Sequence, residues 1–345
     1  MIGHLLDGER RNGRGGFDVP APSGGTLRFA RATDADLDAA LASLEPATRP
    51  EGFLREVLED AIDDLGDDPL HEDELAAALS VPRASLPPRF VDLDRVLDAR
   101  SRRRPPRRVA LAAHWTDGVA ELLRRLAGPL LDGSAILLAS DVRCPGAADA
   151  VAEVLLDAGL PAGRLALLHG LEHRALIERS SGLDRVRMTV DDAAAARALR
   201  PSAGERRIAL DWPTGAVRRA GSDGAGDPAA AYASAFGARE AFGGQLPGRT
   251  AVLEIPVRDH AAWVRALVDL VDRGDATAPP VDREAERRFQ ALLRATLDQG
   301  ATLVAARQER GQVVFGPALA VNAELRMDAV REPSCVPLLC VRRVP

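Results

Sequence analysis

The sequence contains no lysine, because all 45 residues in its lysine-plus-arginine total are arginines. Codon bias in a GC-rich genome is the simplest explanation. The chemical consequence holds in either case. A chain without lysine has no Schiff-base lysine, no P-loop lysine and no lysine that could clamp a nucleotide ribose. The net charge of -6 also gives no general attraction to nucleic acid.

Cysteine and long apolar runs are scarce as well. Cys144, Cys335 and Cys340 have spacings that suit neither a disulfide framework nor a zinc site. No apolar run approaches the ~20 residues of a membrane span, and Met1–Arg14 is polar and has no signal-peptide core. We therefore expect a cytoplasmic protein that does not enter a membrane. With 345 residues, of which 46% are hydrophobic, the chain can form two globular domains.

A repeated plan in the first half predicts the fold. Four short apolar runs are each followed by a segment with helical spacing, such as Val119–Leu131 and Ala147–Ala158. Such repeats predict an α/β fold with a doubly wound, Rossmann-like parallel sheet, in which ligands bind at the carboxyl ends of the strands. The predicted strands are Val109–Ala113, Ala135–Ala139, Leu165–Leu168 and Val186–Val190.

The flanking segments predict further elements. Asp7-Gly8 is typical of a hairpin turn, and Thr33 is positioned to cap a helix before Glu51–Leu65 forms another. The second half is expected to contain a strand over Thr250–Pro256, an amphipathic helix over Arg283–Leu297 and a β-rich tail. We expect a first domain over residues 1–210 and a second, smaller α/β domain over residues 211–345.

Several short motifs appear in the same order as in the aldehyde dehydrogenase superfamily, which the chain resembles over nearly its whole length. The resemblance implies that family's fold, here with a truncated second domain. The motifs are Thr33–Leu41, His114-Trp115-Thr116, Ala127–Leu138, Val154–Leu165 followed by Leu168-His169-Gly170, Gly244-Gln245, and the tail from Glu332 to Val341.

The resemblance implies a reaction that this chain is poorly equipped to perform. The family uses a cysteine thiolate, an asparagine that stabilises the oxyanion, and a glutamate base. The nucleophile position, two residues after Gln245, is Pro247 in a shortened loop, and the oxyanion position is Thr116. Asp211 falls at the position of the base. Because Pro213 and Thr214 follow it, we favour a helix cap or a surface ion pair for Asp211.

The cofactor positions implied by the resemblance are also altered. Trp115 and Gly170 match the family's pattern, but Ala139 replaces the lysine that contacts the ribose. Asp191-Asp192 begin the helix whose N-terminus would receive the pyrophosphate, and carboxylates there repel an anion. Pro333 falls at the position of a second ribose-binding glutamate. We therefore expect no cofactor; NAD or NADP would bind only if the site were rebuilt.

A metal site is not expected. The segment His169-Gly170-Leu171-Glu172-His173 fits the inverted zinc-protease pattern, but it crosses a strand end and a glycine instead of lying within one helix.

Three functions remain open. The favoured one is a degenerate family member that acts as a scaffold, a regulator or a partner subunit. The second is an NAD(P)-dependent aldehyde or acyl oxidoreductase with a site rebuilt from Thr116, Asp211 and Cys144. The third is a binder of acidic ligands or carrier proteins through the basic run Arg100–Arg108. A pocket that is filled by side chains favours the first, and an open polar pocket favours the second.

The tail suggests association. Family members extend beyond the position of Val341, so the apolar segments of the tail are expected to form an uncovered sheet edge that recruits a second copy or another protein. In the alternative, Arg342, Arg343 and Pro345 blunt that edge and the protein is a monomer.

Overall fold

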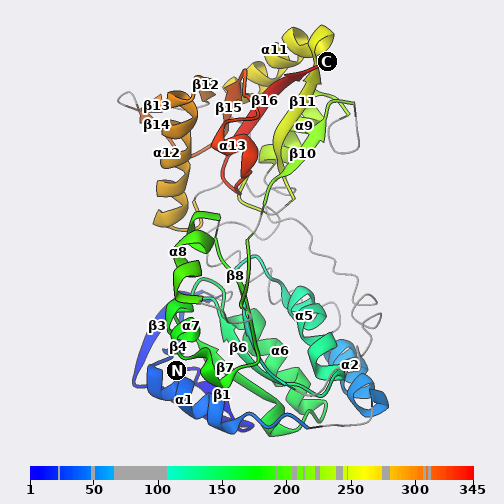
Figure 1. The fold of residues 1–345 in the computed structure, drawn as a ribbon, viewed down its shortest axis with the longest axis vertical. Coiled ribbons are helices and arrows are strands. Elements are labelled where there is room, and N and C mark those ends of the chain that lie inside the picture. Colours follow the sequence, from blue (N-terminus) through cyan, green and yellow to red (C-terminus); the bar gives the residue numbers. More distant parts are fainter. Residues whose placement is uncertain are drawn as a thin grey trace. The chain divides into compact units, whose positions relative to one another are not determined.

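The computed structural model of the chain forms two compact units (Figure 1). The described residues as far as Asp211 belong to the first unit, and those from Trp212 onward belong to the second. The structure describes residues 1–21, 24–47, 51–65, 107–191, 193–203, 208–212, 214–221, 226–237, 244–246, 248–273, 280–305, 308–309 and 312–345. Asp192, Pro213 and Pro247 lie outside these residues.

The first unit is built on a seven-stranded sheet with the order β2-β1-β7-β6-β5-β8-β9. The strands β5 to β9 are mutually parallel, which confirms the predicted doubly wound sheet. The strand order reverses between β5 and β8, because β6 and β7 lie on one side of β5 and β8 and β9 lie on the other. The five parallel strands are β5 (Arg108–Ala112), β6 (Ala135–Ser140), β7 (Leu165–His169), β8 (Arg185–Thr189) and β9 (Ile208–Asp211).

Helices cover both faces of this sheet. On one face, α2 (Glu51–Leu65), α5 (Val119–Leu131) and α6 (Gly146–Asp157) bury a Leu- and Ala-rich core. On the other face, the core contains residues of α1 (Asp34–Ser43) and α7 (His173–Glu178), and α8 (Ala193–Ala203) packs beside it. Thr33 begins α1 with a capping box, as the sequence predicts.

The N-terminal residues extend the sheet instead of forming a free arm. The strands β1 (His4–Leu6) and β2 (Glu9–Arg11) form a hairpin, and β1 pairs antiparallel with β7. Asp7 and Gly8 form the turn with φ angles of 53° and 74°, the left-handed conformation of a tight hairpin. A second hairpin contains β3 (Gly15–Pro20) and β4 (Thr26–Arg31).

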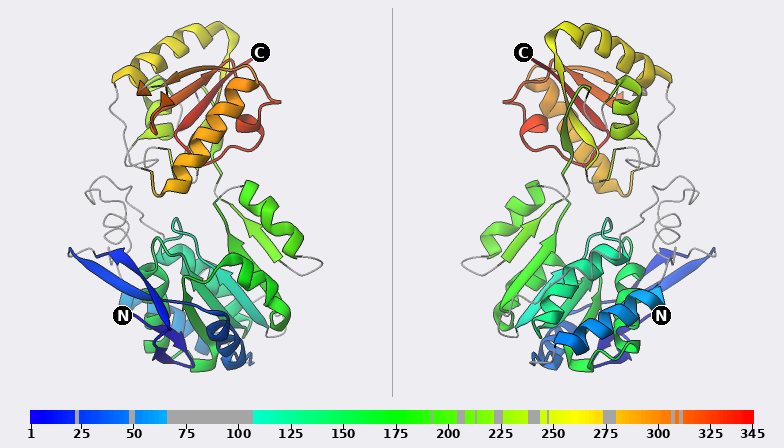
Figure 2. Two further views of the ribbon diagram at one scale, coloured as in Figure 1. Left: turned by 90° about the vertical axis from the view of Figure 1, so that its left-hand side faces the viewer. Right: turned by 90° about the vertical axis from the view of Figure 1, so that its right-hand side faces the viewer.

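The second unit is a three-layer α/β structure. Its sheet has the order β10-β11-β16-β15-β12, in which only the β12–β15 pair is antiparallel. Figure 2 shows helices on both sides of this sheet. The helices α9 (Pro228–Phe236) and α11 (Val257–Arg273) cover one face, and α12 (Arg283–Asp298) and α13 (Asp328–Arg331) cover the other. The strands are β10 (Ala216–Arg219), β11 (Thr250–Pro256), β12 (Thr302–Ala305), β15 (Ala318–Val321) and β16 (Leu338–Val344), and a small separate pair contains β13 (Gln308–Glu309) and β14 (Gln312–Val313).

The prediction of an uncovered apolar edge in the tail is wrong. The strand β16 lies between β11 and β15, and β15 lies between β16 and β12, so these apolar strands are interior. Helices bury them on both faces. The edges are β10 and β12 instead, and the physical basis for the association prediction is removed. Among the described residues, no helix is both long enough and apolar enough to span a bilayer.

Candidate functional site

The reversal of strand order in the first unit brings polar side chains together. Open parallel sheets bind ligands outside the carboxyl ends of their strands, at the point where the order reverses. Here that point lies between β5 and β8. His114 to Asp117 follow β5, Asp141 to Arg143 follow β6, and Asp191 follows β8. The sequence-derived positions Trp115, Thr116 and Asp191 therefore lie at the same edge of the sheet.

Arg143 links the ends of β6 and β8, and His114 joins them from the end of β5. It donates to Asp141 through Nε at 2.9 Å and through Nη2 at 2.6 Å, which is a bidentate ion pair. Its Nη1 donates to Asp191 Oδ1 at 2.8 Å. The same Asp191 oxygen lies 3.0 Å from His114 Nε2. These four residues form the strand-end network, in which two carboxylates share one guanidinium and one imidazole.

The network is mostly shielded from water. The side chain of Asp141 is 7% exposed and that of Arg143 is 19% exposed. Burial alone would raise the pKa of Asp141, but the charge and hydrogen bonds of Arg143 hold this pKa below its usual value. Burial alone would lower the pKa of Arg143, whereas Asp141 and Asp191 raise it. Both side chains are therefore ionised near neutral pH.

Trp115 and Thr116 are held by the same network. The backbone N–H of Trp115 donates to Asp141 Oδ2 at 3.0 Å, and the guanidinium of Arg143 lies 5.9 Å from the centre of the buried indole ring. Thr116 Oγ1 lies 2.7 Å from His114 Nδ1. Because a carboxylate only accepts, a neutral His114 carries its proton on Nε2, and its Nδ1 accepts from the Thr116 hydroxyl. The hydroxyl of Thr116, at the oxyanion position, therefore already forms a hydrogen bond with His114.

Asp211, which falls at the position of the family's base, ends β9 and forms an ion pair. Its Oδ2 accepts from Arg187 Nε at 2.8 Å, and both side chains are about half exposed. Arg187 lies in the neighbouring strand β8, where it pairs in register with Ala209 of β9. Two strand residues on the same face of the sheet therefore account for the position of the Asp211 carboxylate.

Ala139 and Gly170 are parts of the packing. Ala139 lies in β6 and is buried in the core between the sheet and α1. Gly170 has φ = 61°, and a Cβ atom there would lie 2.9 Å from Phe17 Cε1, so a larger residue would strain the backbone and displace the Phe17 ring. Cys144 is buried as well.

The two histidines of the zinc-like pattern are separated by the end of a strand. His169 ends β7 and stacks on His4 at a ring-centre distance of 5.9 Å, whereas His173 begins α7. Within the described residues, no group of three or more His, Cys, Asp or Glu side chains could hold a metal ion.

In the second unit, Gln245 stabilises a turn. Its buried side chain accepts a hydrogen bond from the backbone N–H of Val281 at 2.8 Å. Gly244 has φ = 93°, and a Cβ there would lie 2.7 Å from Pro337 Cα. Burial raises the pKa of Cys335 to about 11 and that of Cys340 to about 12. Both thiols therefore stay protonated at neutral pH and are poor nucleophiles.

Assigning residues by their positions in the family's motifs does not identify the side chains that contact Asp191 and Asp211. Arg143 and His114 were not identified as partners of Asp191, and Arg187 was not identified as the partner of Asp211. One signal was available. In a parallel sheet, a polar residue directly after one strand is placed close to polar residues that follow its neighbours. Asp141 and Arg143 directly follow the strand β6.

Comparisons with known proteins agree with the fold. A model of the aldehyde dehydrogenase family matches residues 83–345. No curated protein matches the sequence at a significant level. Among solved structures, aldehyde dehydrogenase C of Pseudomonas syringae, crystallised as a mutant with NAD+ and octanal, has a TM-score of 0.77 and 18% identity over 99% of this chain and 80% of that one.

Two further structures are similar to the same extent. The aldehyde dehydrogenase of Mycobacterium tuberculosis in complex with NAD+ has a TM-score of 0.77 and 19% identity, over 99% of this chain and 81% of that one. The aldehyde dehydrogenase KauB of Pseudomonas aeruginosa has a TM-score of 0.77 and 17% identity, over 100% of this chain and 80% of that one. At such identities the likeness shows the fold alone.

Proposed function

The chain belongs to the aldehyde dehydrogenase family, and we propose that it is a member that neither binds NAD or NADP nor oxidises aldehydes. In this proposal it acts as a scaffold, a regulator or a partner subunit. The strand-end network carries the proposal, because it lies at the carboxyl ends of the strands, where an open parallel sheet binds its ligand.

The residues of the strand-end network do not fit a dinucleotide. Asp141 and Asp191 place two carboxylates at the strand ends, and Arg143, which would otherwise attract a pyrophosphate, is engaged by both. A like-charge contact costs about 1–4 kcal/mol at intermediate dielectric. Ala139 is buried in the core and offers no hydrogen-bonding group to a ribose. In this site the charges of Asp141, Asp191 and Arg143 offset one another, so no cationic group of the network is left to bind a pyrophosphate.

The thiols support the same conclusion about chemistry. The family's reaction requires a thiolate that attacks the aldehyde carbon. Cys144 is buried in the first unit, and Cys335 and Cys340 have raised pKa values because of burial. The position of the family's nucleophile is Pro247, which has no nucleophilic group.

The alternative of a rebuilt oxidoreductase site finds no support in the described contacts. It would need Thr116 as a donor, Asp211 as a base and Cys144 as a nucleophile. Instead, the Thr116 hydroxyl contacts His114, Asp211 pairs with Arg187, and Cys144 is buried.

A partner remains part of the proposal. Members of the aldehyde dehydrogenase family are commonly oligomeric, so a second copy or another protein is the proposed partner. Light scattering of the purified chain at micromolar concentration, together with co-purification from its native host, tests this point.

Calorimetric titration with NAD and with NADP tests the loss of cofactor binding, and a panel of aliphatic and aromatic aldehydes tests the loss of catalysis. We expect no dissociation constant below about 100 μM and no reduced cofactor above a buffer blank. Tighter binding of NAD or NADP would refute the proposed loss of cofactor binding. Turnover that disappears in the Asp211→Ala variant would establish a rebuilt site.

A further inference from the structure

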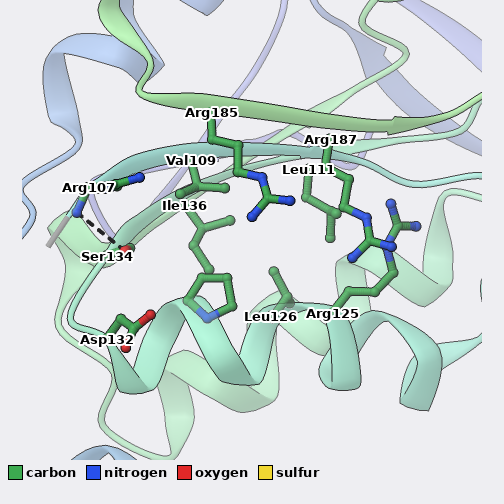
Figure 3. Close-up of a pocket in the computed structure, with 11 residues that line it drawn as sticks. Arg107, Val109, Leu111, Arg125, Leu126, Asp132, Ser134, Ile136, Arg185 and Arg187 are labelled. Atoms are coloured by element: carbon green, nitrogen blue, oxygen red, sulfur yellow. Dashed lines mark hydrogen bonds between the residues drawn. The ribbon is translucent and has the colours of Figure 1, made fainter. Parts of the chain in front are cut away.

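We infer that the first unit carries a binding site for a small organic monoanion with an apolar body. The site is a cavity of about 90 Å³ between α5 and one face of the sheet (Figure 3). Its walls come from β5, β6 and β8 and from α5, and none of its lining residues belongs to the strand-end network. The inference is independent of the proposed loss of dehydrogenase activity.

The topology of the sheet creates this cavity. The helices α5 and α6 cover β5, β6 and β7 on this face, whereas α7 and α8 lie on the opposite face. The strand β8 buries Val186 and Met188 on that opposite face, so Arg185 and Arg187 point to the α5 side. Figure 3 shows both arginines reaching from β8 toward α5.

The floor of the cavity is apolar. Val109 and Leu111 of β5 lie beside Arg185 and Arg187 in the ladder, and Ile136 of β6 follows. From the helix, Leu126 and Pro129 complete the lining. Removing apolar ligand surface from water against such side chains contributes about 25 cal/mol per Å². This volume is several times the ~10–15 Å³ that a single water needs on the same measure, which suits a short acyl chain.

One end of the cavity is cationic. Arg125 and Arg187 lie close to each other there, and Arg185 points toward the middle (Figure 3). Arg125 is 7% exposed and pairs through Nη1 with Asp117, yet its buried Nε and Nη2 have no hydrogen-bond partner among the described residues. Burial lowers the pKa of Arg125, and the charge of nearby Arg187 lowers it further. An anion at this end would satisfy both donors and reduce the repulsion.

The charges favour a monoanion. Arg125 and Arg187 each have a carboxylate partner, Asp117 and Asp211. Arg185 forms no ion pair with any residue in the described part of the chain. This end therefore has an excess of one positive charge. A carboxylate or a phosphate monoanion neutralises that charge, and its oxygen atoms match the geometry of the guanidinium donors.

The acidic residue at the other end sets the orientation. Asp132 lies beside Ser134 and Arg107, away from Arg125 and Arg187 (Figure 3). Arg107 and Asp132 offset each other's charge at this end, which therefore has no net positive charge for a second anionic group. The anionic head is therefore placed at the cationic end, among Arg125, Arg187 and Arg185, and the apolar body extends along Ile136 toward Asp132. A dicarboxylate of similar length is disfavoured.

Calorimetric titration of the full chain tests the site with defined probes. Hexanoate and the phosphodiester hexyl methyl phosphate, both monoanions at neutral pH, present the two head groups; hexanol lacks the charge, and acetate lacks the apolar body. We expect saturable binding of at least one of the two anions, with hexanol and acetate at least about tenfold weaker. The tighter of the two anions identifies the head group.

Two variants locate the binding. Arg185→Gln removes the cation that has no ion-pair partner in the described part of the chain and should weaken binding about tenfold or more. Val109→Phe should abolish binding by filling the floor of the cavity. Arg174→Gln, at an exposed position of helix α7, is the matched control and should leave binding unchanged. Circular dichroism verifies that each variant is folded. An absence of saturable binding for both anions, or equal weakening by Arg174→Gln, would overturn the inference.

Discussion

Arg143 Nη1 donates to Asp191 Oδ1 at 2.8 Å, so a residue that follows β6 holds the residue that follows β8. Between these two strands lies β5, and the contact therefore crosses the point at which the strand order reverses. Open α/β sheets bind their ligands at this point. In this chain, side chains from the sheet's own loops supply both the anion and the cation there.

Removing Arg143 should destabilise the first unit. In an Arg143→Met variant, Asp141 keeps a nearly buried carboxylate without its bidentate partner. Breaking a buried ion pair in this way costs about 3–5 kcal/mol, and the partial exposure of Arg143 places the expected loss near the lower end of that range. Urea unfolding, monitored by hydrogen exchange of peptides from β5 and β8, measures the decrease in the free energy of unfolding of this unit.

Two further variants separate the network from a general effect of lost charge. The double variant Arg143→Met/Asp141→Asn should be more stable than Arg143→Met alone, because it no longer buries an unpaired carboxylate. Arg174→Gln removes an exposed arginine paired with Glu178 and should leave the unfolding curve unchanged. Equal stability of the single and double variants would contradict the ionic role of Arg143.

Local pattern predicted the elements well. The apolar run Leu165–Leu168 corresponds to β7, and the expected helix Glu51–Leu65 agrees with α2. A continuous apolar run indicates a strand that is buried on both faces, and periodic apolar spacing indicates a helix that is buried on one face. Both patterns are visible in the sequence. The order of strands within a sheet depends on long-range pairing. The sequence therefore predicts that the strand β16 exists but not that it lies in the middle of its sheet.

The candidate site shows the same limit. The sequence placed Thr116 and Asp191 after strands and identified the anionic character of Asp191. It did not predict that Arg143, which is 48 residues away from Asp191, would neutralise that charge. This contact exists only because the strand order places the ends of β6 and β8 on either side of β5.

The stability of the first unit should fall in mild acid because of His4. This buried residue stacks on His169, and its Nδ1 accepts from the His169 backbone N–H at 3.2 Å. Burial lowers the pKa of His4 and His169 lowers it further, whereas Asp36 raises it. The folded state therefore binds fewer protons than the unfolded chain. The stability contributed by neutral His4 is lost as the pH falls below the unfolded value of 6.5.

The variant His4→Asn tests this dependence. The Asn oxygen can still accept from the His169 N–H, but the side chain does not titrate. The free energy of unfolding of the parent should decrease from about pH 7 to about pH 5, and the decrease should be smaller in His4→Asn. Parallel pH curves for the two proteins would exclude His4 as the titrating group.

Gly244 should tolerate substitution less well than Gly248. Both have positive φ angles, 93° and 76°, so an alanine at either position costs about 1–2 kcal/mol in backbone strain. A Cβ on Gly244 would also lie 2.7 Å from Pro337 Cα, whereas a Cβ on Gly248 meets nothing within 4 Å. Gly244→Ala should therefore lose at least about 1 kcal/mol more than Gly248→Ala. Thermal unfolding of both variants measures the difference, and equal losses would refute the steric argument.

Gln245 should contribute to the stability of the second unit by satisfying a backbone donor. Its buried Oε1 accepts from the Val281 N–H, which directly precedes the N-cap residue Asp282 of α12. Gln245→Ala leaves this N–H without that partner and should cost about 1–3 kcal/mol. Gln299 provides the comparison, because its side chain exchanges two hydrogen bonds with Asp328 at an exposed site. Water replaces those bonds, so Gln299→Ala should cost less. If urea unfolding finds the larger loss in Gln299→Ala, Gln245 does not have the structural role assigned to it.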